Sequence, residues 1–351
     1  MERSIYKVTI GIPVYNVENY IKATLTSALE QDLDGIEILV VDDCGSDHSI
    51  DIVAELQVAN PNGKNIHIIH HTENQGAAGG RNTIIKNAQG KYIFFLDSDD
   101  LIDKTAISTL YNAAEKNNAE VTYGSMMACD QNNNKEPFSI LPSKILEGED
   151  ALINYIYSDI RNNITASSCN ILFLTDFLRK NNLQFPKYKV GEDVLFNDEI
   201  HPLVRKAVLL PDITYYYMKR PNSLMRYQVR DTISVEEIRG SLLFAERKKE
   251  LCQKAYDKPY YGGKCAKIMK GIFYNACGII GHRHQLTDNI SDKEIRDCMT
   301  HPAHLWEILH FKQLRGTNIV FWLLGVLPPK LSVIIMEYIG KKKGYIRIHK
   351  K

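Results

Sequence analysis

The sequence predicts an α/β fold in which a mainly parallel sheet is flanked by helices. Short apolar runs alternate with amphipathic helical patterns over residues 6–126. The runs are almost continuously apolar, as in strands buried on both faces, and a helix between successive strands is typical of parallel pairing. From about residue 232 onward the chain has helical patterns alone. We therefore expect a sheet followed by a helical C-terminal extension.

Each expected element can be placed from its own pattern. The runs with the length and apolar content of strands are Val8–Val14, Ile36–Val41, Ile66–His70, Tyr92–Leu96 and Val121–Tyr123. Helical spacing of apolar residues lies between them, in Val17–Leu29, Ser49–Val58, Arg81–Ala88 and Thr105–Asn117. Ligands of such sheets bind at the carboxyl ends of the strands, so these ends are the places to look for functional residues.

The chain divides further by composition. Residues 127–150 are polar and irregular, which predicts a loop excursion. Residues 151–228 mix helical and strand patterns. We place the boundaries so that three regions result, at 1–126, 127–228 and 229–351.

The totals exclude several classes of protein. The 351-residue chain is 44% hydrophobic and 24% charged, an ordinary globular composition with enough residues for a large core. A net charge of +1 gives no reason to expect nucleic acid as a partner. The seven cysteines are scattered without a C-x-x-C pair, which predicts a reduced, cytoplasmic protein without a zinc site. Met1–Ser4 leads straight into a strand, so we expect no signal peptide.

Acids crowd the carboxyl end of the fourth expected strand, as Asp97-Ser98-Asp99-Asp100. Hard divalent cations such as Mg²⁺ and Mn²⁺ take oxygen ligands, often one or two carboxylates together with phosphate oxygens. Neighbouring carboxylates repel each other unless a cation is present. The alternative is turn or cap chemistry, with Asp100 or Asp103 capping the next helix.

Two other strand ends carry groups suited to a planar ring. Tyr15, in Pro13-Val14-Tyr15-Asn16, follows the first strand and can either stack on a base or shield a helix start. Asp42-Asp43 follows the second strand, and the next residues, Gly-Ser-Asp, suit a turn and a helix cap. An aspartate at this place can accept a hydrogen bond from a ring N–H, and we expect Asp43 to do so.

Small residues follow the third strand. The segment Asn74–Asn82 includes Gly76, Gly79 and Gly80 and opens a helical pattern. Small residues allow close backbone approach and a helix N-terminus attracts anions, so the segment suits a phosphate group, with Arg81 as the cation. The alternative is a tight strand–helix turn. The pattern is neither G-x-G-x-x-G nor G-x-x-x-x-G-K-[ST], so dinucleotide and Walker-type sites lose their main support.

Taken in order, these four motifs resemble those of the family 2 glycosyltransferases, which have the GT-A fold. The first hundred residues match closely, and a looser similarity continues to about residue 228 through Asn170, Phe185-Pro186 and Gly191–Phe196. The resemblance implies a GT-A nucleotide-diphospho-sugar transferase fold. Residues 1–126 would be the nucleotide-sugar-binding half and residues 127–228 the acceptor-binding half. It implies an inverting glycosyltransferase that moves a sugar from a nucleotide donor, usually UDP-linked, to an acceptor hydroxyl.

The resemblance also implies roles at the donor site. Tyr15 would stack on the base, with Pro13 and Asn16 beside it. Asp43 would accept from the uracil N–H, with Asp42 in support.

The sugar and diphosphate would be held by the other two motifs. Gly76 and Arg81 would face the diphosphate, while Asp97 and Ser98 would hold the ribose or the sugar. Asp99 would ligate the metal, Mn²⁺ or Mg²⁺, which would neutralise charge on the leaving diphosphate.

Acids also occur far along the chain, at Glu192-Asp193. Asp193 aligns with the general base of the family, which takes the proton of the acceptor hydroxyl as that oxygen attacks the anomeric carbon. Glu192 can exchange roles with it, and the alternative for both is a first helical turn that favours acids. A loop near residue 220 resembles one that closes over the diphosphate, with Arg220 and Ser223 as candidate contacts or as plain surface residues. Ile171 stands where many relatives have a lysine, which puts a contact from that side chain to the acceptor or the sugar in doubt.

Two classes of protein remain as alternatives. A sugar nucleotidyltransferase would normally carry a Gly-rich, basic loop directly after the first strand. A catalytically degenerate nucleotide-sugar-binding protein would keep Asp43 but lose Asp99 or Asp193, and both acids are present.

The C-terminal segment is apolar and basic. Asn318–Gly340 is interrupted by Pro328-Pro329, and its uninterrupted part is shorter than the ~20 residues of a membrane span. Lys341-Lys342-Lys343 follow. Either residues 318–351 make a peripheral membrane contact, or they form a buried helical pair with a solvated basic end. The resemblance suggests assembly of a bacterial surface polysaccharide on a glycan or lipid-linked acceptor, in the cytoplasm at the inner face of the plasma membrane.

Overall fold

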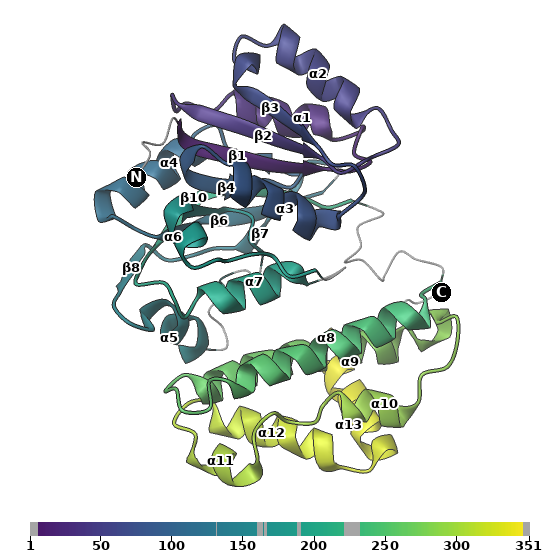
Figure 1. Cartoon of the computed structure of the whole chain (residues 1–351). Coiled ribbons are helices and arrows are strands. Elements are labelled where there is room, and N and C mark those ends of the chain that lie inside the picture. The colour runs from purple at the N-terminus through teal and green to yellow at the C-terminus, as the bar shows by residue number, and fades with distance from the viewer. Residues whose placement is uncertain are drawn as a thin grey trace. The chain divides into compact units, whose positions relative to one another are not determined.

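The structure, a computed structural model, describes residues 6–130, 132–159, 164, 167–187, 191–220 and 232–346. The chain forms two compact units (Figure 1). We call Met1–Leu152 with Asn163–Arg220 the sheet unit, and Ile153–Asn162 with Pro221–Lys351 the helical unit.

In the part of the chain that the structure describes, the sheet unit contains one ten-stranded sheet. Its order is β3-β2-β1-β4-β9-β6-β10-β5, and β7 pairs with β6 while β8 pairs with β10. The strands are β1 (Tyr6–Val14), β2 (Ile36–Asp42), β3 (Ile66–His70), β4 (Gly90–Phe95), β5 (Leu101–Ile102), β6 (Val121–Cys129), β7 (Lys135–Ser139), β8 (Lys144–Glu147), β9 (Ile171–Leu174) and β10 (Lys206–Met218).

The N-terminal half of the sheet is parallel, as the continuous apolar runs predict. β1 pairs in parallel with β2 and β4, and β2 pairs in parallel with β3. The helices of this unit are α1 (Ile21–Leu29), α2 (Ser49–Ala59), α3 (Gly76–Asn87), α4 (Ala106–Asn117), α6 (Thr175–Lys180) and α7 (Glu192–Ile200), with the first turns of α5 (Ala151–Ser158). α3 packs against β1 and β2, and α6 packs against β4. The α/β prediction is therefore confirmed. The sheet as a whole is mixed rather than mainly parallel, because β9 pairs antiparallel with β4 and β6, β7 with β6, and β5 and β8 with β10.

The prediction of a loop excursion over residues 127–150 is wrong. β6 continues to Cys129, and β7 and β8 follow within the predicted excursion. β7 is largely exposed and pairs antiparallel with β6, so backbone hydrogen bonds rather than an apolar face place it in the sheet. Such a polar strand has no hydrophobic pattern to reveal it.

The strand order reverses at β1. The chain lays β2 and β3 on one side of β1 and then returns to place β4 on the other side. A crevice forms outside the carboxyl ends of the strands at such a reversal, and it is the usual ligand site of an open α/β sheet. The motifs that follow β1 and β4 lie at this point.

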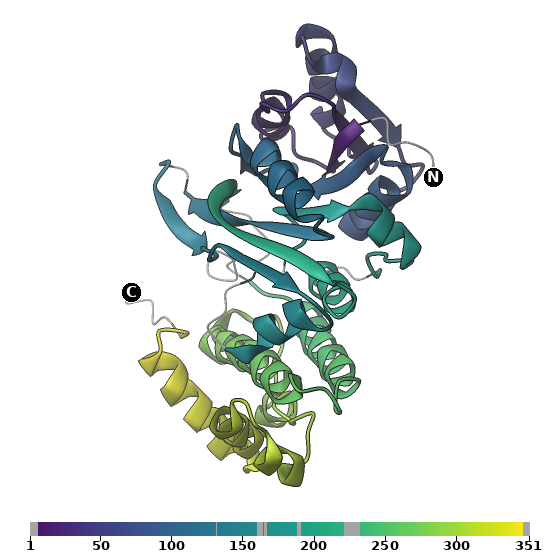
Figure 2. The ribbon, with the colours of Figure 1, turned by 90° about the vertical axis from the view of Figure 1, so that its left-hand side faces the viewer.

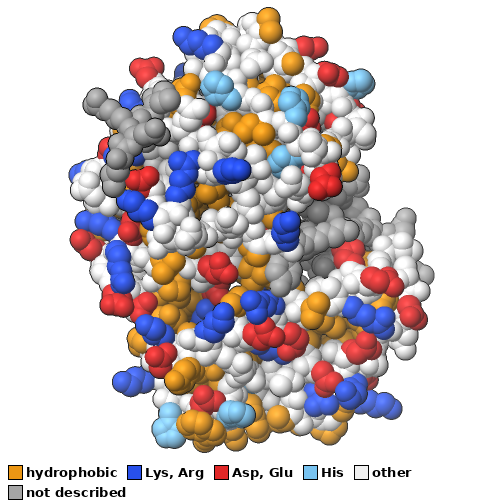
Figure 3. Space-filling view, in the orientation of Figure 1, with side chains coloured by type: hydrophobic (Ala, Val, Ile, Leu, Met, Phe, Trp, Pro, Cys, Tyr) orange, Lys and Arg blue, Asp and Glu red, His pale blue; other side chains and the backbone are white. Residues whose placement is uncertain are grey.

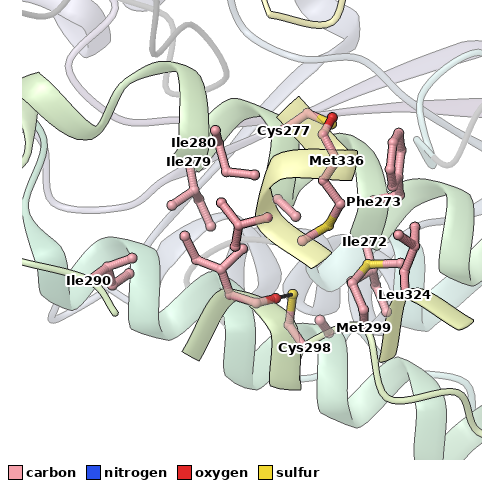
Figure 4. Close-up of a cluster of buried hydrophobic side chains, with 14 of the residues drawn as sticks. Ile272, Phe273, Cys277, Ile279, Ile280, Ile290, Cys298, Met299, Leu324 and Met336 are labelled. Carbon is pink, nitrogen blue, oxygen red and sulfur yellow. Dashed lines mark hydrogen bonds between the residues drawn. The ribbon is translucent and has the colours of Figure 1, made fainter. Parts of the chain in front are cut away.

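The helical unit has a core of its own. The described helices are α8 (Val235–Gln253), α9 (Tyr261–Gly281), α10 (Asp292–Asp297), α11 (Leu305–His310), α12 (Arg315–Val326) and α13 (Pro329–Lys342), with most of α5. They form one bundle in both views of the ribbon (Figures 1 and 2). Ile272 and Phe273 of α9, Leu324 of α12 and Met336 of α13 meet in its buried centre (Figure 4). The predicted helical C-terminal region is thus confirmed. None of the described helices is both long and apolar enough to cross a membrane.

Candidate active site

The ends of β1 and β2 are joined at the predicted site. The backbone N–H of Asp43 donates to the carbonyl of Val14 over 3.0 Å. Asn16 has φ 51°, and its side-chain oxygen accepts from the N–H of Ser46 at 2.8 Å, so Asn16 holds the turn after β2. Tyr15 lies between Val14 and Asn16 in the chain and is half exposed. Its ring is therefore open to a stacking partner.

Asp43 is buried and occupies the N-terminus of α3. Its two oxygens accept the backbone N–H groups of Gln75 and Gly76, each at 2.8 Å. These are among the N–H groups that a helix leaves unpaired at its start, so the carboxylate is the anion that this helix end attracts. The N–H of Gly76 is therefore not free to meet a diphosphate. Asp42 is less enclosed and pairs with His70 at 2.8 Å.

His71 links Asp43 to α3 and was not singled out by the sequence. Its side chain is buried, with Nδ1 2.7 Å from a carboxylate oxygen of Asp43 and Nε2 2.8 Å from the hydroxyl of Thr83. Thr83 lies two residues beyond Arg81 on the same helix. The one available signal was position, because His71 follows β3 at the edge of the sheet where the other motifs lie.

Arg81 gathers three carboxylates from distant parts of the chain. Its side chain is buried, and its two terminal nitrogens lie 2.7 Å from Asp97, 2.9 Å from Glu192 and 3.2 Å from Asp193. Although burial alone lowers the pKa of Arg81, Asp193, Asp97 and Glu192 raise it well above its ordinary value. One permanently charged guanidinium thus fixes the acid that follows β4 beside the two acids that begin α7.

Asp193 has the electrostatics of a proton acceptor. Burial raises the pKa of its carboxyl to about 6, and the nearby charges of Asp97 and Glu192 act in the same direction, while Arg81 opposes them. A carboxylate with this pKa remains ionised near pH 7 yet is basic enough to take a proton in a reaction. Asp97 beside it is about one-third exposed.

Asp99 lies in a pocket of about 150 Å³ lined by Asn19, Thr24 and Met218, among others. Its carboxylate pairs with Arg220, whose guanidinium lies 4.5 Å from the centre of the Tyr20 ring. Burial lowers the pKa of Arg220. In this arrangement a guanidinium provides the positive charge at the position where the sequence predicts a metal. Tyr20 is a second residue that the sequence did not single out.

Asp100 does not cap the next helix. It is buried, accepting from the hydroxyl of Tyr215 and from the N–H of Met218, each at 2.8 Å. Burial raises the pKa of its carboxyl to about 7, and Asp97 adds to the effect. Asp103 instead accepts from the N–H of Thr105 at the start of α4.

The remaining predicted residues divide by position. Ser98 is buried, and its carbonyl accepts from the hydroxyl of Thr24 at 3.0 Å, which joins the acid cluster to α1. Pro13 packs closely against Gly80, because a Cβ added to Gly80 would lie 2.8 Å from the Cβ of Pro13. Ser223 lies outside the described residues. No three His, Cys, Asp or Glu side chains gather closely enough to hold a metal ion by themselves within the described ranges.

The sheet reverses its strand order at β1, and the carboxylates that follow β4 and begin α7 meet on Arg81. The fold agrees with that of the crystal structure of Staphylococcus aureus TarS 1–349 in complex with UDP, at a TM-score of 0.62 and 18% identity, over 98% of this chain and 93% of that one. The same S. aureus segment has also been crystallised with UDP-GlcNAc, and its fold matches with a TM-score of 0.57 at 20% identity, over 96% of this chain and 92% of that one.

The sequence comparisons name the family. The profile described as Glycosyl transferase family 2 matches residues 9–180. Glycosyltransferase GlyA of Streptococcus pneumoniae is 30% identical over 227 residues, which are 63% of this chain and 32% of that protein. The poly(ribitol-phosphate) beta-glucosyltransferase of Bacillus spizizenii is 30% identical over 216 residues, 60% of this chain and 32% of that protein. Residues 9–180 form a glycosyl transferase family 2 domain, and the chain matches about a third of the length of these two curated relatives.

Proposed function

We propose that this protein is an inverting, metal-dependent glycosyltransferase that uses a nucleotide-sugar donor, most suitably a UDP-sugar. The observation that carries the proposal is the Arg81 cluster. It fixes Asp97, at the carboxyl end of β4, beside Asp193, at the start of α7, within the reach of a single guanidinium. A sugar held at Asp97 would thus lie beside a basic carboxylate that can activate an acceptor hydroxyl.

The nucleotide would bind at the ends of β1 and β2. The exposed ring of Tyr15 is available to stack on the base, with Pro13 and Asn16 fixing its backbone. We retain Asp43 as the acceptor for the uracil N–H, supported by Asp42. Three of its contacts are already made within the chain, which would hold it rigidly for one further bond. The choice of uracil is supported by the S. aureus structures with UDP and UDP-GlcNAc.

The metal would be held by Asp99 together with diphosphate oxygens of the donor. One or two carboxylates with phosphate oxygens are an ordinary ligand set for Mg²⁺ or Mn²⁺, so the absence of a three-residue metal site among the described residues does not conflict with it. A bound divalent cation would supply charge neutralisation at the leaving diphosphate. Arg220 would release Asp99 and turn its charge to the phosphates. This is the role expected for Gly76 and Arg81, but the N–H of Gly76 and the two terminal nitrogens of Arg81 are already paired. Ser98 would support this segment through its backbone.

The chemical step would be one displacement. Asp193 takes the proton of the acceptor hydroxyl while that oxygen forms a bond to the anomeric carbon of the sugar. The bond from that carbon to the diphosphate oxygen breaks, and its electron pair leaves with the diphosphate. Attack from the side opposite the leaving group inverts the configuration, and no covalent intermediate is required. Glu192 would act by sharing Arg81 and keeping Asp193 in place.

The cellular setting follows from the relatives and from the C-terminal helices. The B. spizizenii protein and S. aureus TarS are named for transfer to poly(ribitol-phosphate). We propose assembly of a cell-surface polysaccharide, with a glycan or lipid-linked acceptor, in the cytoplasm at the inner face of the plasma membrane. Residues 318–351 would make a peripheral contact with that membrane.

Titration calorimetry of the full chain with UDP, GDP and dTDP, with and without Mn²⁺, tests the donor and the metal together. We expect UDP to bind best and to depend on Mn²⁺. In Asp99→Ala we expect the Mn²⁺-dependent part of UDP binding to disappear, because the only protein ligand proposed for the metal is lost. Unchanged Mn²⁺-dependent binding in that variant would refute the ligand assignment. Preference for another nucleotide would refute the UDP assignment and leave the fold as described.

A further inference from the structure

The helices α11, α12 and α13 carry an unusual concentration of apolar surface. Of the 19 exposed large hydrophobic side chains among the described residues, nine lie between residues 305 and 338. In the space-filling view, hydrophobic side chains gather along the lower edge, over α11 and α12 (Figure 3). Contiguous apolar surface of this kind marks an interaction site in a folded protein, whereas single exposed residues do not.

α12 presents large apolar residues to solvent at one helical spacing. Val320, Leu323 and Val326 recur every three residues, and each is about half exposed. The opposite side of the helix buries Asn318 and Gly325 together with Phe321 and Leu324. α12 is therefore apolar on both sides, which an ordinary surface helix is not.

α13 repeats the arrangement more strongly. Its buried positions include Ser332 and Gly340, while Ile334 is 61% exposed and Tyr338 is 66% exposed. The hydroxyl of Ser332 donates to the carbonyl of Leu324 at 2.7 Å, which fixes α13 against α12. Because α13 also buries Val333 and Met336, it is apolar on its exposed side as well as on its buried side.

The small inward residues prevent the helices from turning that face inward. A Cβ on Gly325 would lie 2.5 Å from the carbonyl oxygen of Met299, and one on Gly340 would lie 2.9 Å from the sulfur of Cys277. The side-chain amide of Asn318 donates to the carbonyl of Gly262 at 2.9 Å. Rotation of α12 would drive a larger side chain into the backbone at Met299, and rotation of α13 would drive one into the side chain of Cys277. The outward direction of the apolar residues is therefore fixed by packing.

α11 extends the same surface. It packs against α12 and exposes Trp306 by 66% and Leu309 by half. Trp and Tyr are the side chains that suit a membrane–water boundary, because a large apolar ring and a polar N–H or O–H are satisfied on opposite sides of it. The set of exposed apolar residues on α11, α12 and α13 is called the outer face below.

The charges around the outer face indicate which kind of partner it would bind. Over residues 305–346 two acids stand against six basic residues, which are Lys312, Arg315, Lys330, Lys341, Lys342 and Lys343. One acid, Glu337, is already paired with Lys341 at 2.6 Å. A second copy of this chain would bring the same excess of positive charge and be repelled. An anionic lipid surface supplies the opposite charge and an apolar layer together.

We infer that the outer face of α11–α13 inserts into the interface of an anionic membrane, with the helices lying along its plane. This deepens the membrane contact proposed above, and α11 adds a part that lies before residue 318. The contact requires no spanning segment, because interfacial helices bury only their apolar side in the boundary of headgroups and acyl chains. It holds the helical unit at the place where a lipid-linked substrate is found.

Flotation of the full chain with vesicles tests the inference without donor, metal or acceptor. We expect binding to vesicles of phosphatidylcholine with phosphatidylglycerol, and much weaker binding to phosphatidylcholine alone. In Trp306→Ser/Leu323→Ser/Ile334→Ser we expect binding to fall at least ~10-fold, because the buried apolar area is lost. The matched control is Leu243→Ser, which removes a residue 71% exposed on α8 of the same unit and should bind as the unchanged protein does.

A second variant separates the charge from the apolar contact. Lys342→Gln/Lys343→Gln should weaken binding to the anionic vesicles by about fivefold per lysine, and raised salt should remove the difference. Circular dichroism checks that each variant is folded. Failure of the unchanged protein to float, or equal flotation of the triple variant, would overturn the inference. So would a dimer that the triple variant abolishes, since the face would then belong to a second copy. Vesicle binding without UDP binding would refute the proposed donor and leave the inference standing.

Discussion

The two units depart from ordinary burial in opposite ways. The sheet unit places charge inside, at Asp43, Arg81 and Asp100, which are all nearly inaccessible. The helical unit places large apolar side chains outside, on α11–α13, in addition to those that fill its core. Both units otherwise have apolar cores, although the helical unit also buries Lys249 and Lys264.

The difference teaches that each unit departs from ordinary burial at the place where we propose that it binds: buried charge at the proposed donor site, and exposed apolar side chains at the proposed membrane face. Buried charge in the sheet unit is expensive unless each group is paired, and here every such group has a partner. Apolar area that stays exposed in the helical unit does not contribute to the free energy of folding. Both are local departures from the folding pattern, and such departures are where functional residues are expected.

The largest expected effect comes from removing the buried cation. Arg81→Met would leave Asp97, Glu192 and Asp193 together without their guanidinium. We expect the free energy of unfolding to fall by about 3 kcal/mol or more, the scale of a broken buried ion pair. Urea denaturation measures it. Lys180→Met, which removes an exposed partner of Asp176, should change it little. Equal effects in the two variants would show that the charge inside the sheet unit is no more than surface charge.

The next effect separates Asp193 from Asp100, the two acids whose carboxyl pKa values are raised to about 6 and about 7. We expect Asp193→Asn to spare UDP binding and to reduce transfer by at least ~100-fold, as for a lost general base. Asp100→Asn is the matched control, because Asp100 contacts Tyr215 and Met218 rather than Arg81. We expect that variant to remain within a few-fold of the unchanged protein. Near-normal transfer by Asp193→Asn, measured with a donor that the protein accepts, would move the base elsewhere.

The pH dependence gives a smaller and graded effect. Because the pKa of Asp193 is raised from its usual value near 4 to about 6, the carboxyl becomes protonated as the pH falls through 6 and can no longer accept a proton. We expect kcat/KM to fall about tenfold per pH unit below that point. The inflection should persist in Asp100→Asn, which removes the other carboxyl whose pKa burial raises, in that case to about 7. A flat profile between pH 5 and 7 would contradict the role of Asp193.

The smallest effect concerns the link between Asp43 and α3. His71→Leu removes the contacts to Asp43 and Thr83, so the carboxylate loses one of its partners. We expect UDP affinity to weaken by about tenfold, which is about 1.4 kcal/mol and the scale of one charged hydrogen bond, with kcat nearly unchanged. His70→Leu, which removes a more exposed contact to Asp42, should have less effect. A change in kcat alone would contradict a positioning role in donor binding.

Much of the fold was predictable because its signals are local. The apolar runs at Ile36–Val41 and Ile66–His70 fall within a residue of β2 and β3, and the helix over Ser49–Val58 matches α2 as closely. The part of the sheet with antiparallel strands was less predictable. β7 is polar and β9 has four residues, so neither has a pattern long enough to stand out.

The candidate site was predictable at the level of motifs and not of partners. Arg81 and Asp193 could each be named from a local motif, but their contact joins positions more than a hundred residues apart. Nothing in either motif says that Arg81 faces carboxylates rather than phosphate. His71 and Tyr20 were missed for the same reason, since their roles arise from Asp43 and Arg220 across the fold. The roles assigned to the individual site residues remain predictions.

The Arg81 cluster has a consequence for the order in which a growing chain acquires its parts. β1 to β4, with the ends that would bind nucleotide, are complete by residue 95, whereas α7 begins only at residue 192. Chains emerge from the ribosome N-terminus first, at roughly 5–20 residues per second, so many seconds separate the two. During that interval Arg81 and Asp97 can pair, but Asp193 has not yet been synthesised. A nascent chain can therefore complete the strands of the proposed nucleotide site well before it has the carboxylate that would make that site reactive.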